Sequence, residues 1–108
     1  MGITRPKEGW NMQRVTTHPG EILREEFMKP LGLSANRLAL DLHVPVTRIS
    51  EIIHERRSVS ADTALRLARY FGTDAEYWLR FQMAYDLSKA RLQYKKLINK
   101  QVPVAKAS

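Results

Sequence analysis

Hydrophobic residues recur at helical spacing in five segments of the chain, and the alternating pattern of a β-strand is nearly absent. The first segment begins at Pro19, and Pro30 and Gly32, which disfavour continuation of a helix, are expected to end it. His18 precedes it directly, in the position of a helix cap. The pattern predicts an all-α protein of five helices.

The second and third segments are short and closely spaced. Ser34 is a suitable N-cap for the second, which ends near His43, and Pro45 opens the third. Each segment carries a narrow apolar stripe, which we expect to be buried in the core. The residues of these two stripes are Leu38, Ala39, Leu42, Ile49, Ile52 and Ile53.

The fourth and fifth segments also carry clear start and stop signals. Ser60 caps the fourth and Gly72 ends it. Thr73 and Glu76 form a capping box at the start of the fifth, whose helical pattern continues past Asp86. The apolar residues that we expect these helices to bury are Ala64, Leu65, Leu67, Ala68, Phe71, Tyr77, Trp78 and Phe81.

A second apolar stripe follows along the last helix, with successive spacings of four, three, four and three residues. We interpret it as a dimer interface, and the alternative is that this helix folds back on its own subunit. The stripe consists of Met83, Leu87, Ala90, Tyr94 and Leu97. The expected organisation is an arm over residues 1–17, a folded domain over 18–87, and a basic helix and tail over 88–108.

Residues 34–53 have the spacing of a helix-turn-helix. Ala39 is a small residue midway along the first of the two helices, where the second helix must approach. His43 stands four positions later, where the turn requires a left-handed φ that glycine adopts most easily and histidine tolerates. The branched residues Ile49 and Ile52 follow six and nine positions further on. A helical bundle that resembles this motif by chance is the alternative.

The polar surface of the third helix favours DNA binding over that alternative, because its residue types read base edges or bind phosphate. Some of these residues also have a simpler interpretation: Ser34 is a plain N-cap, and Glu51 pairs with Arg48 or Arg56 instead of contacting a base. The predicted DNA-binding residues are Ser34, Asn36, Arg37, Val46, Thr47, Arg48, Ser50, Glu51, Arg56 and Arg57.

Charge supports a polyanionic partner. The net charge is +7, from 18 basic and 11 acidic residues, and residues 89–108 contribute six basic side chains and no acidic one. This excess is typical of nucleic-acid binding, although a basic tail that only keeps the protein in solution has the same composition.

Composition argues against several other classes of protein. The chain has no cysteine and only three histidines without an HExxH pattern, so we expect no disulfide, metal or cofactor. It has neither the apolar run of a membrane span nor that of a secretory signal, so we expect a cytoplasmic protein. A nucleic-acid-cleaving enzyme is the rival from another class, but no residue near His54 and Glu55 offers a nucleophile.

Motifs at residues 18–23 (HPGEIL), 44–57, 60–73 and 77–87 together resemble the HigA-type antitoxins, also called VapI-like, of the Xre/Cro helix-turn-helix class. The resemblance implies a five-helix, lambda-repressor-like DNA-binding domain. It further implies a homodimer that represses its own operon and neutralises a HigB-type, mRNA-cleaving toxin. A stand-alone Xre-family repressor without a toxin is the alternative with the same fold.

The toxin-binding surface is predicted from charge. HigB-type toxins bind RNA and present basic surfaces, and the acidic residues outside the third helix concentrate on the first helix. The simpler interpretation is that Glu21 complements the helix dipole and that the other two pair with Arg24 and Lys29. The predicted contacts are Trp10, Glu21, Glu25 and Glu26.

Overall fold

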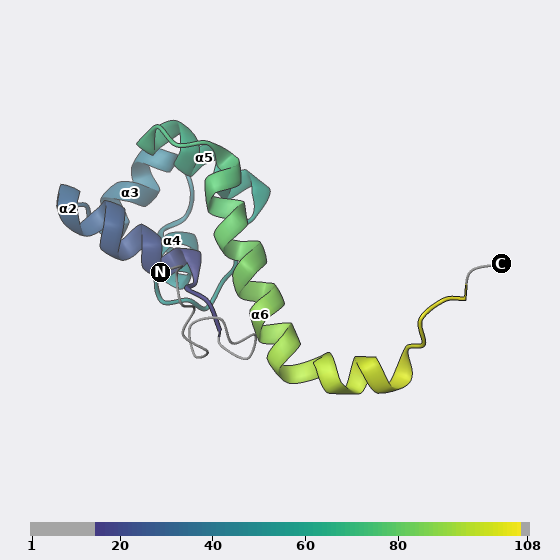
Figure 1. Cartoon of the computed structure of the whole chain (residues 1–108). Coiled ribbons are helices and arrows are strands. Elements are labelled where there is room, and N and C mark those ends of the chain that lie inside the picture. Colours follow the sequence, from purple (N-terminus) through teal and green to yellow (C-terminus); the bar gives the residue numbers. More distant parts are fainter. Residues whose placement is uncertain (1–14, 107–108) are drawn as a thin grey trace, which may run out of the picture.

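The computed structural model describes residues 15–106, which form five helical bodies and no β-strand. The predicted all-α fold of five helices is confirmed (Figure 1). The first body is a continuous helix in three parts, α1 (Pro19–Ile22), η1 (Leu23–Met28) and α2 (Lys29–Leu31). The other four are α3 (Ala35–Leu42), α4 (Val46–Ile53), α5 (Ala61–Phe71) and α6 (Ala75–Gln101).

The first helix does not end at Pro30, and that prediction was wrong. Pro30 lies in α2, and the helix ends at Gly32, whose φ of 63° makes it a left-handed C-cap. The turn before the proline is a π-helix, in which the N–H of Lys29 bonds to the carbonyl of Arg24, five residues back. Since a proline ring collides with the carbonyl four residues back in an α-helix, the wider turn gives the ring room.

The five helices enclose one core around Trp78, whose side chain is fully buried. Phe27 and Phe71 pack against its indole, with ring centroids 5.0 and 6.3 Å away. Leu65 was predicted to be buried but is 64% exposed, because it lies one residue off the stripe that faces the core. Other fully buried side chains are Leu23, Leu38, Ile49, Ile52 and Leu67.

The N-cap of α6 is Asp74, not Thr73 as predicted from the capping box. The Asp74 carboxylate accepts the N–H of Tyr77 at 2.7 Å. The Thr73 hydroxyl instead accepts the indole N–H of Trp78 at 2.9 Å. A buried indole N–H needs a hydrogen-bond partner, and this tertiary requirement takes Thr73 out of the capping position.

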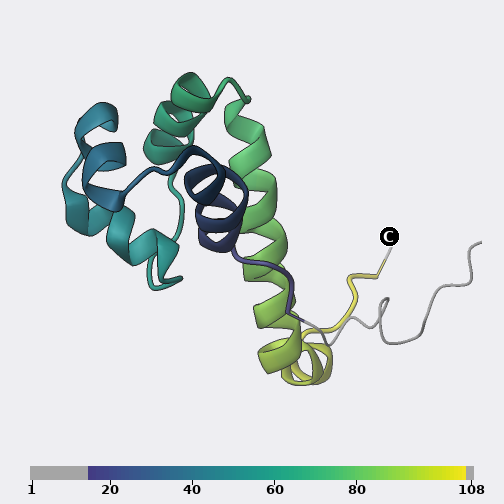
Figure 2. The ribbon, with the colours of Figure 1, turned by 90° about the vertical axis from the view of Figure 1, so that its left-hand side faces the viewer.

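The second half of α6 extends away from the domain. All residues from 91 to 106 are exposed, so this segment does not fold back on the described part of its own chain. Figures 1 and 2 show a change of direction along α6. The hydroxyl of Ser88 donates to the carbonyl of Tyr85 at 2.9 Å, a contact that bends helices. It also accepts the N–H of Thr16 at 3.0 Å, which places residues 15–18 beside α6 (Figure 2).

No helix among residues 15–106 is both long enough and apolar enough to cross a membrane.

Candidate nucleic-acid interface

The segment from α3 to α4 has helix-turn-helix geometry. His43 adopts the left-handed conformation that its position requires, with φ 58° and ψ 46°. The N–H of Val44 bonds to the carbonyl of Ala39 at 3.1 Å, which closes the end of α3. Ala39, Ile49 and Ile52 are buried, as their spacing predicted.

The opposite face of α4 is open at its N-terminal end. Val46 is 41% exposed and Thr47 is exposed, so both can reach a groove. Ser50 is half-buried, and its carbonyl lies 2.7 Å from Nδ1 of His54, one turn further on. Because the rest of α4 is anchored in the core, this end presents a fixed surface.

Arg48 is the predicted base-reading residue that has an intramolecular partner. Its Nη1 lies 2.6 Å from a carboxylate oxygen of Asp62 at the start of α5, and its side chain is only 28% exposed. Arg66 donates to the same oxygen at 3.0 Å. Hydrogen bonds from Arg66 and Arg48 lower the pKa of Asp62. The sequence predictions did not include Asp62, because no helical spacing links residues 14 positions apart.

The loop after α4 places two arginines in different environments. Arg57 pairs with Glu51 at 2.8 Å, with both side chains more than 40% exposed. Glu51 therefore forms a salt bridge, but with Arg57 instead of Arg48 or Arg56. Arg56 is exposed and pairs with no carboxylate among the described residues. Its cation is the freer of the two for a phosphate.

The N-terminal end of α3 lies beside α5. Ser34 is the N-cap, as its simpler interpretation required, and accepts the N–H of Arg37 at 3.0 Å. Arg37 pairs with Asp41 at 3.1 Å and stays 63% exposed, and Asn36 is exposed. The hydroxyl of Tyr70 donates to Asp41, which, with Arg37 nearby, lowers the pKa of that carboxyl.

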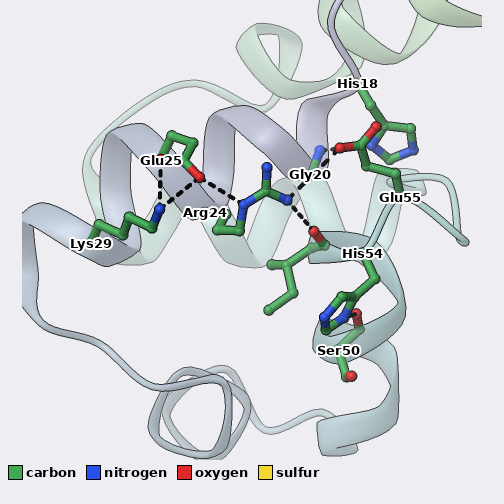
Figure 3. A network of polar contacts seen from close by, with 9 residues as sticks. His18, Gly20, Arg24, Glu25, Lys29, Ser50, His54 and Glu55 are labelled. Atoms are coloured by element: carbon green, nitrogen blue, oxygen red, sulfur yellow. Dashed lines mark hydrogen bonds and ion pairs between the residues drawn. The ribbon is translucent and has the colours of Figure 1, made fainter.

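The C-terminal end of α4 contacts the first helix (Figure 3). His18 is the N-cap of α1, as predicted, and its Nδ1 accepts the N–H of Gly20 at 2.8 Å. Arg24 donates to the carbonyl of Ile53 and lies 3.8 Å from Glu55. Glu55 has a left-handed φ of 62°, which no sequence signal indicated. This network joins two helices that were predicted separately.

The predicted dimer stripe on α6 is exposed. Met83, Leu87, Tyr94 and Leu97 are 58%, 44%, 45% and 49% exposed, and Ala90 is also exposed. A shallow groove of about 250 Å³ lies on the same stretch of helix. Its lining residues are Leu87, Ala90, Arg91, Lys95, Ile98 and Asn99.

The predicted toxin contacts lie in different settings. Glu21 and Glu26 are exposed. Glu25 pairs with Arg24 at 2.8 Å and with Lys29 at 2.9 Å, which is the simpler interpretation of that residue. These two cations lower the pKa of the Glu25 carboxyl. Trp10 lies outside the described residues.

The fold and the interface define a class of DNA-binding protein. The helix-turn-helix family matches residues 25–78, half of the 108-residue chain. The chain belongs to this family. Within it, the chain is similar to the HigA-type antitoxins, as the motifs between residues 18 and 87 predicted.

Three relatives illustrate this similarity. Over 88 residues the chain is 59% identical to virulence-associated protein I of Dichelobacter nodosus, covering 82% of this chain and 81% of that protein. The Pseudomonas aeruginosa antitoxin HigA, solved with the higBA promoter, gives a TM-score of 0.78 at 40% identity, covering 81% of this chain and 95% of that one. The antitoxin GraA in complex with its operator gives 0.82 at 46% identity, covering 87% and 94%.

Proposed function

We propose that this protein is the antitoxin of a type II toxin-antitoxin pair, and that it binds operator DNA as a homodimer to repress its own operon. The observation that carries the DNA-binding part is the fixed, open N-terminal end of α4, where Val46 and Thr47 project from a helix anchored by Ile49 and Ile52. The relatives HigA and GraA, solved with promoter and operator DNA, support this proposal.

The repression mechanism is steric and needs no catalysis by the chain. A two-fold dimer places its two recognition helices about 34 Å apart, so that they enter successive major grooves on one side of the duplex. The half-sites are then palindromic and roughly 10 base pairs apart. Occupation of such an operator blocks the promoter, and this role places the protein in the cytoplasm with the chromosome.

Thr47 and Arg48 test the assignment of α4 to the major groove. We expect the double variant Thr47→Ala/Arg48→Ala to lose footprint protection of the DNA upstream of its own gene. Arg48→Ala alone weakens binding by about 1–3 kcal/mol if this arginine leaves Asp62 to read a base. The control variant Thr17→Ala/Arg80→Ala removes the same two side-chain types at exposed positions elsewhere. Normal protection by the first double variant would contradict the assignment.

The partner under this proposal is a HigB-type, mRNA-cleaving toxin that docks away from α4, on residues 1–29. Glu21 and Glu26 are the acidic groups that remain free to meet a basic surface, since Glu25 already has two cationic partners. Charge complementarity of this kind speeds association and sets specificity, while buried apolar groups such as Trp10 supply affinity.

The toxin contact is testable by calorimetry with the product of the adjacent gene. We expect Glu21→Lys/Glu26→Lys, combined with deletion of residues 1–14, to weaken toxin binding and leave operator binding largely intact. Glu76→Lys, on α6, is the control reversal of an exposed glutamate. Unchanged toxin affinity would move the contact elsewhere, first to the basic second half of α6. If no adjacent product binds, the chain is a stand-alone repressor.

A further inference from the structure

We propose that Arg24, on the first helix, is a positioning residue for operator binding: it fixes the C-terminal end of α4 and thereby the direction in which α4 enters the groove. The inference rests on the operator binding proposed above. Arg24 itself is placed away from the open end of α4, so it acts through the helix and not by contact with DNA.

The last carbonyls of α4 explain why an arginine is needed there. The final carbonyls of a helix have no partner inside the helix. The N–H groups of residues 54–56 bond to the carbonyls of Ser50, Ile52 and Glu51. The guanidinium of Arg24 donates to the carbonyl of Ile53. A cation at this position also complements the negative end of the helix dipole.

The approach of the two helices at this end is very close. A Cβ atom on Gly20 would lie 1.8 Å from the carbonyl oxygen of Ile52, which is the neighbour of the carbonyl that Arg24 binds. The backbones of α1 and α4 are therefore in contact at this point. The end of α4 is held by one backbone contact and one charged hydrogen bond from the same helix.

The guanidinium of Arg24 is itself oriented by two carboxylates (Figure 3). Its Nε donates to Glu25 at 2.8 Å, and its Nη1 lies 3.8 Å from Glu55. Glu25 is in turn held by Lys29 at 2.9 Å. A planar guanidinium can make all these contacts at once, whereas the ammonium of a lysine is a single point charge on a flexible stem.

The position of α4 is thus fixed at both ends by tertiary contacts. At its start, Arg48 pairs with Asp62 on α5 at 2.6 Å. At its end, Arg24 binds the carbonyl of Ile53. Sequence-specific readout requires base-contacting atoms to stand within hydrogen-bond geometry of base edges, while binding to the phosphate backbone tolerates small rotations. Loss of Arg24 should therefore weaken specific binding more than non-specific binding.

The experiment compares Arg24→Ala, Arg24→Lys and the control Arg80→Ala, which removes the same charge from an exposed site on α6. The probes are the DNA upstream of the protein's own gene and a scrambled duplex of equal length, titrated by fluorescence anisotropy at several salt concentrations. Hydrogen exchange of the amides of residues 53–56 reports directly on the end of α4.

We expect Arg24→Ala to weaken binding to the upstream DNA about tenfold, the factor that corresponds to loss of one charged hydrogen bond. Its affinity for the scrambled duplex and its salt slope should match those of Arg80→Ala, and exchange at residues 53–56 should be faster. Arg24→Lys should restore part of the specific affinity.

Three results would overturn the inference. One is unchanged specific affinity, and another is equal weakening on both duplexes with a salt slope reduced by about one unit, which would make Arg24 a phosphate contact. The third is Arg24→Lys binding no better than Arg24→Ala although its melting temperature is normal. If the unmodified protein does not distinguish the two duplexes, operator binding fails instead.

Discussion

The backbone of α1 reaches α4 so closely at position 20 that only a hydrogen atom fits between them. We expect Gly20→Ala to lower the free energy of unfolding by about 1–3 kcal/mol, because the methyl group would overlap the Ile52 carbonyl and the helices must separate. Urea denaturation measures this change. Glu21→Ala, at the exposed neighbouring position, should change stability by no more than about 0.5 kcal/mol. Equal midpoints for both variants would contradict the close contact.

His18 is a buried cap that works only when its Nδ1 is unprotonated, since this atom accepts the N–H of Gly20. Burial lowers the pKa of His18 below 6.5; Glu55 and Asp86 oppose this shift, and Lys89 adds to it. The unfolded chain therefore binds the proton more tightly than the folded one. This contribution to stability is complete above pH 6.5 and is lost as the pH falls from 6.5 through the folded pKa.

The variant His18→Asn separates this titration from the others. Asparagine is a good N-cap that does not titrate. We expect its free energy of unfolding to vary less than that of the unmodified protein between pH 7.5 and the folded pKa of His18, measured by urea denaturation at each pH. Parallel pH profiles of the two proteins would show that His18 contributes no such dependence.

At the scale of elements, the loop between α4 and α5 carries one paired and one unpaired arginine. We expect Arg56→Ala to weaken binding to all DNA sequences and to reduce the salt slope by about one unit, because a phosphate contact is lost. Arg57→Ala is the matched comparison and should reduce the slope less, since Arg57 already pairs with Glu51. Anisotropy titrations at several salt concentrations measure both slopes. A larger effect of Arg57→Ala would reverse the assignment.

At the scale of the whole molecule, the second half of α6 extends from the domain with its apolar stripe uncovered. We expect Leu87→Asp to convert a dimer into monomers, because it places a charge in the middle of the stripe. Leu92→Asp is the matched control: Leu92 is 54% exposed but lies about 140° around the helix from Leu87. Sedimentation measures the mass of each variant. An intact Leu87→Asp dimer would remove this stripe from the interface.

Local signals in the sequence were sufficient for much of the fold. Ser34 and Ser60 cap their helices, and Gly72 ends α5 with a left-handed φ of 75°. The left-handed turn at His43 was also predicted. Capping, turn geometry and apolar periodicity depend on residues within about one helical turn of each other, so the sequence alone carries them.

Tertiary structure alone decided the features that depend on residues far apart in the chain. Thr73 gives up its cap position because it must satisfy the indole of Trp78, and Arg48 turns to Asp62 on another helix. The contact of Arg24 with the carbonyl of Ile53 spans 29 residues, and no periodicity connects them. Such partners are selected by the packing of whole helices, which brings a buried or charged group within reach of the one atom that satisfies it.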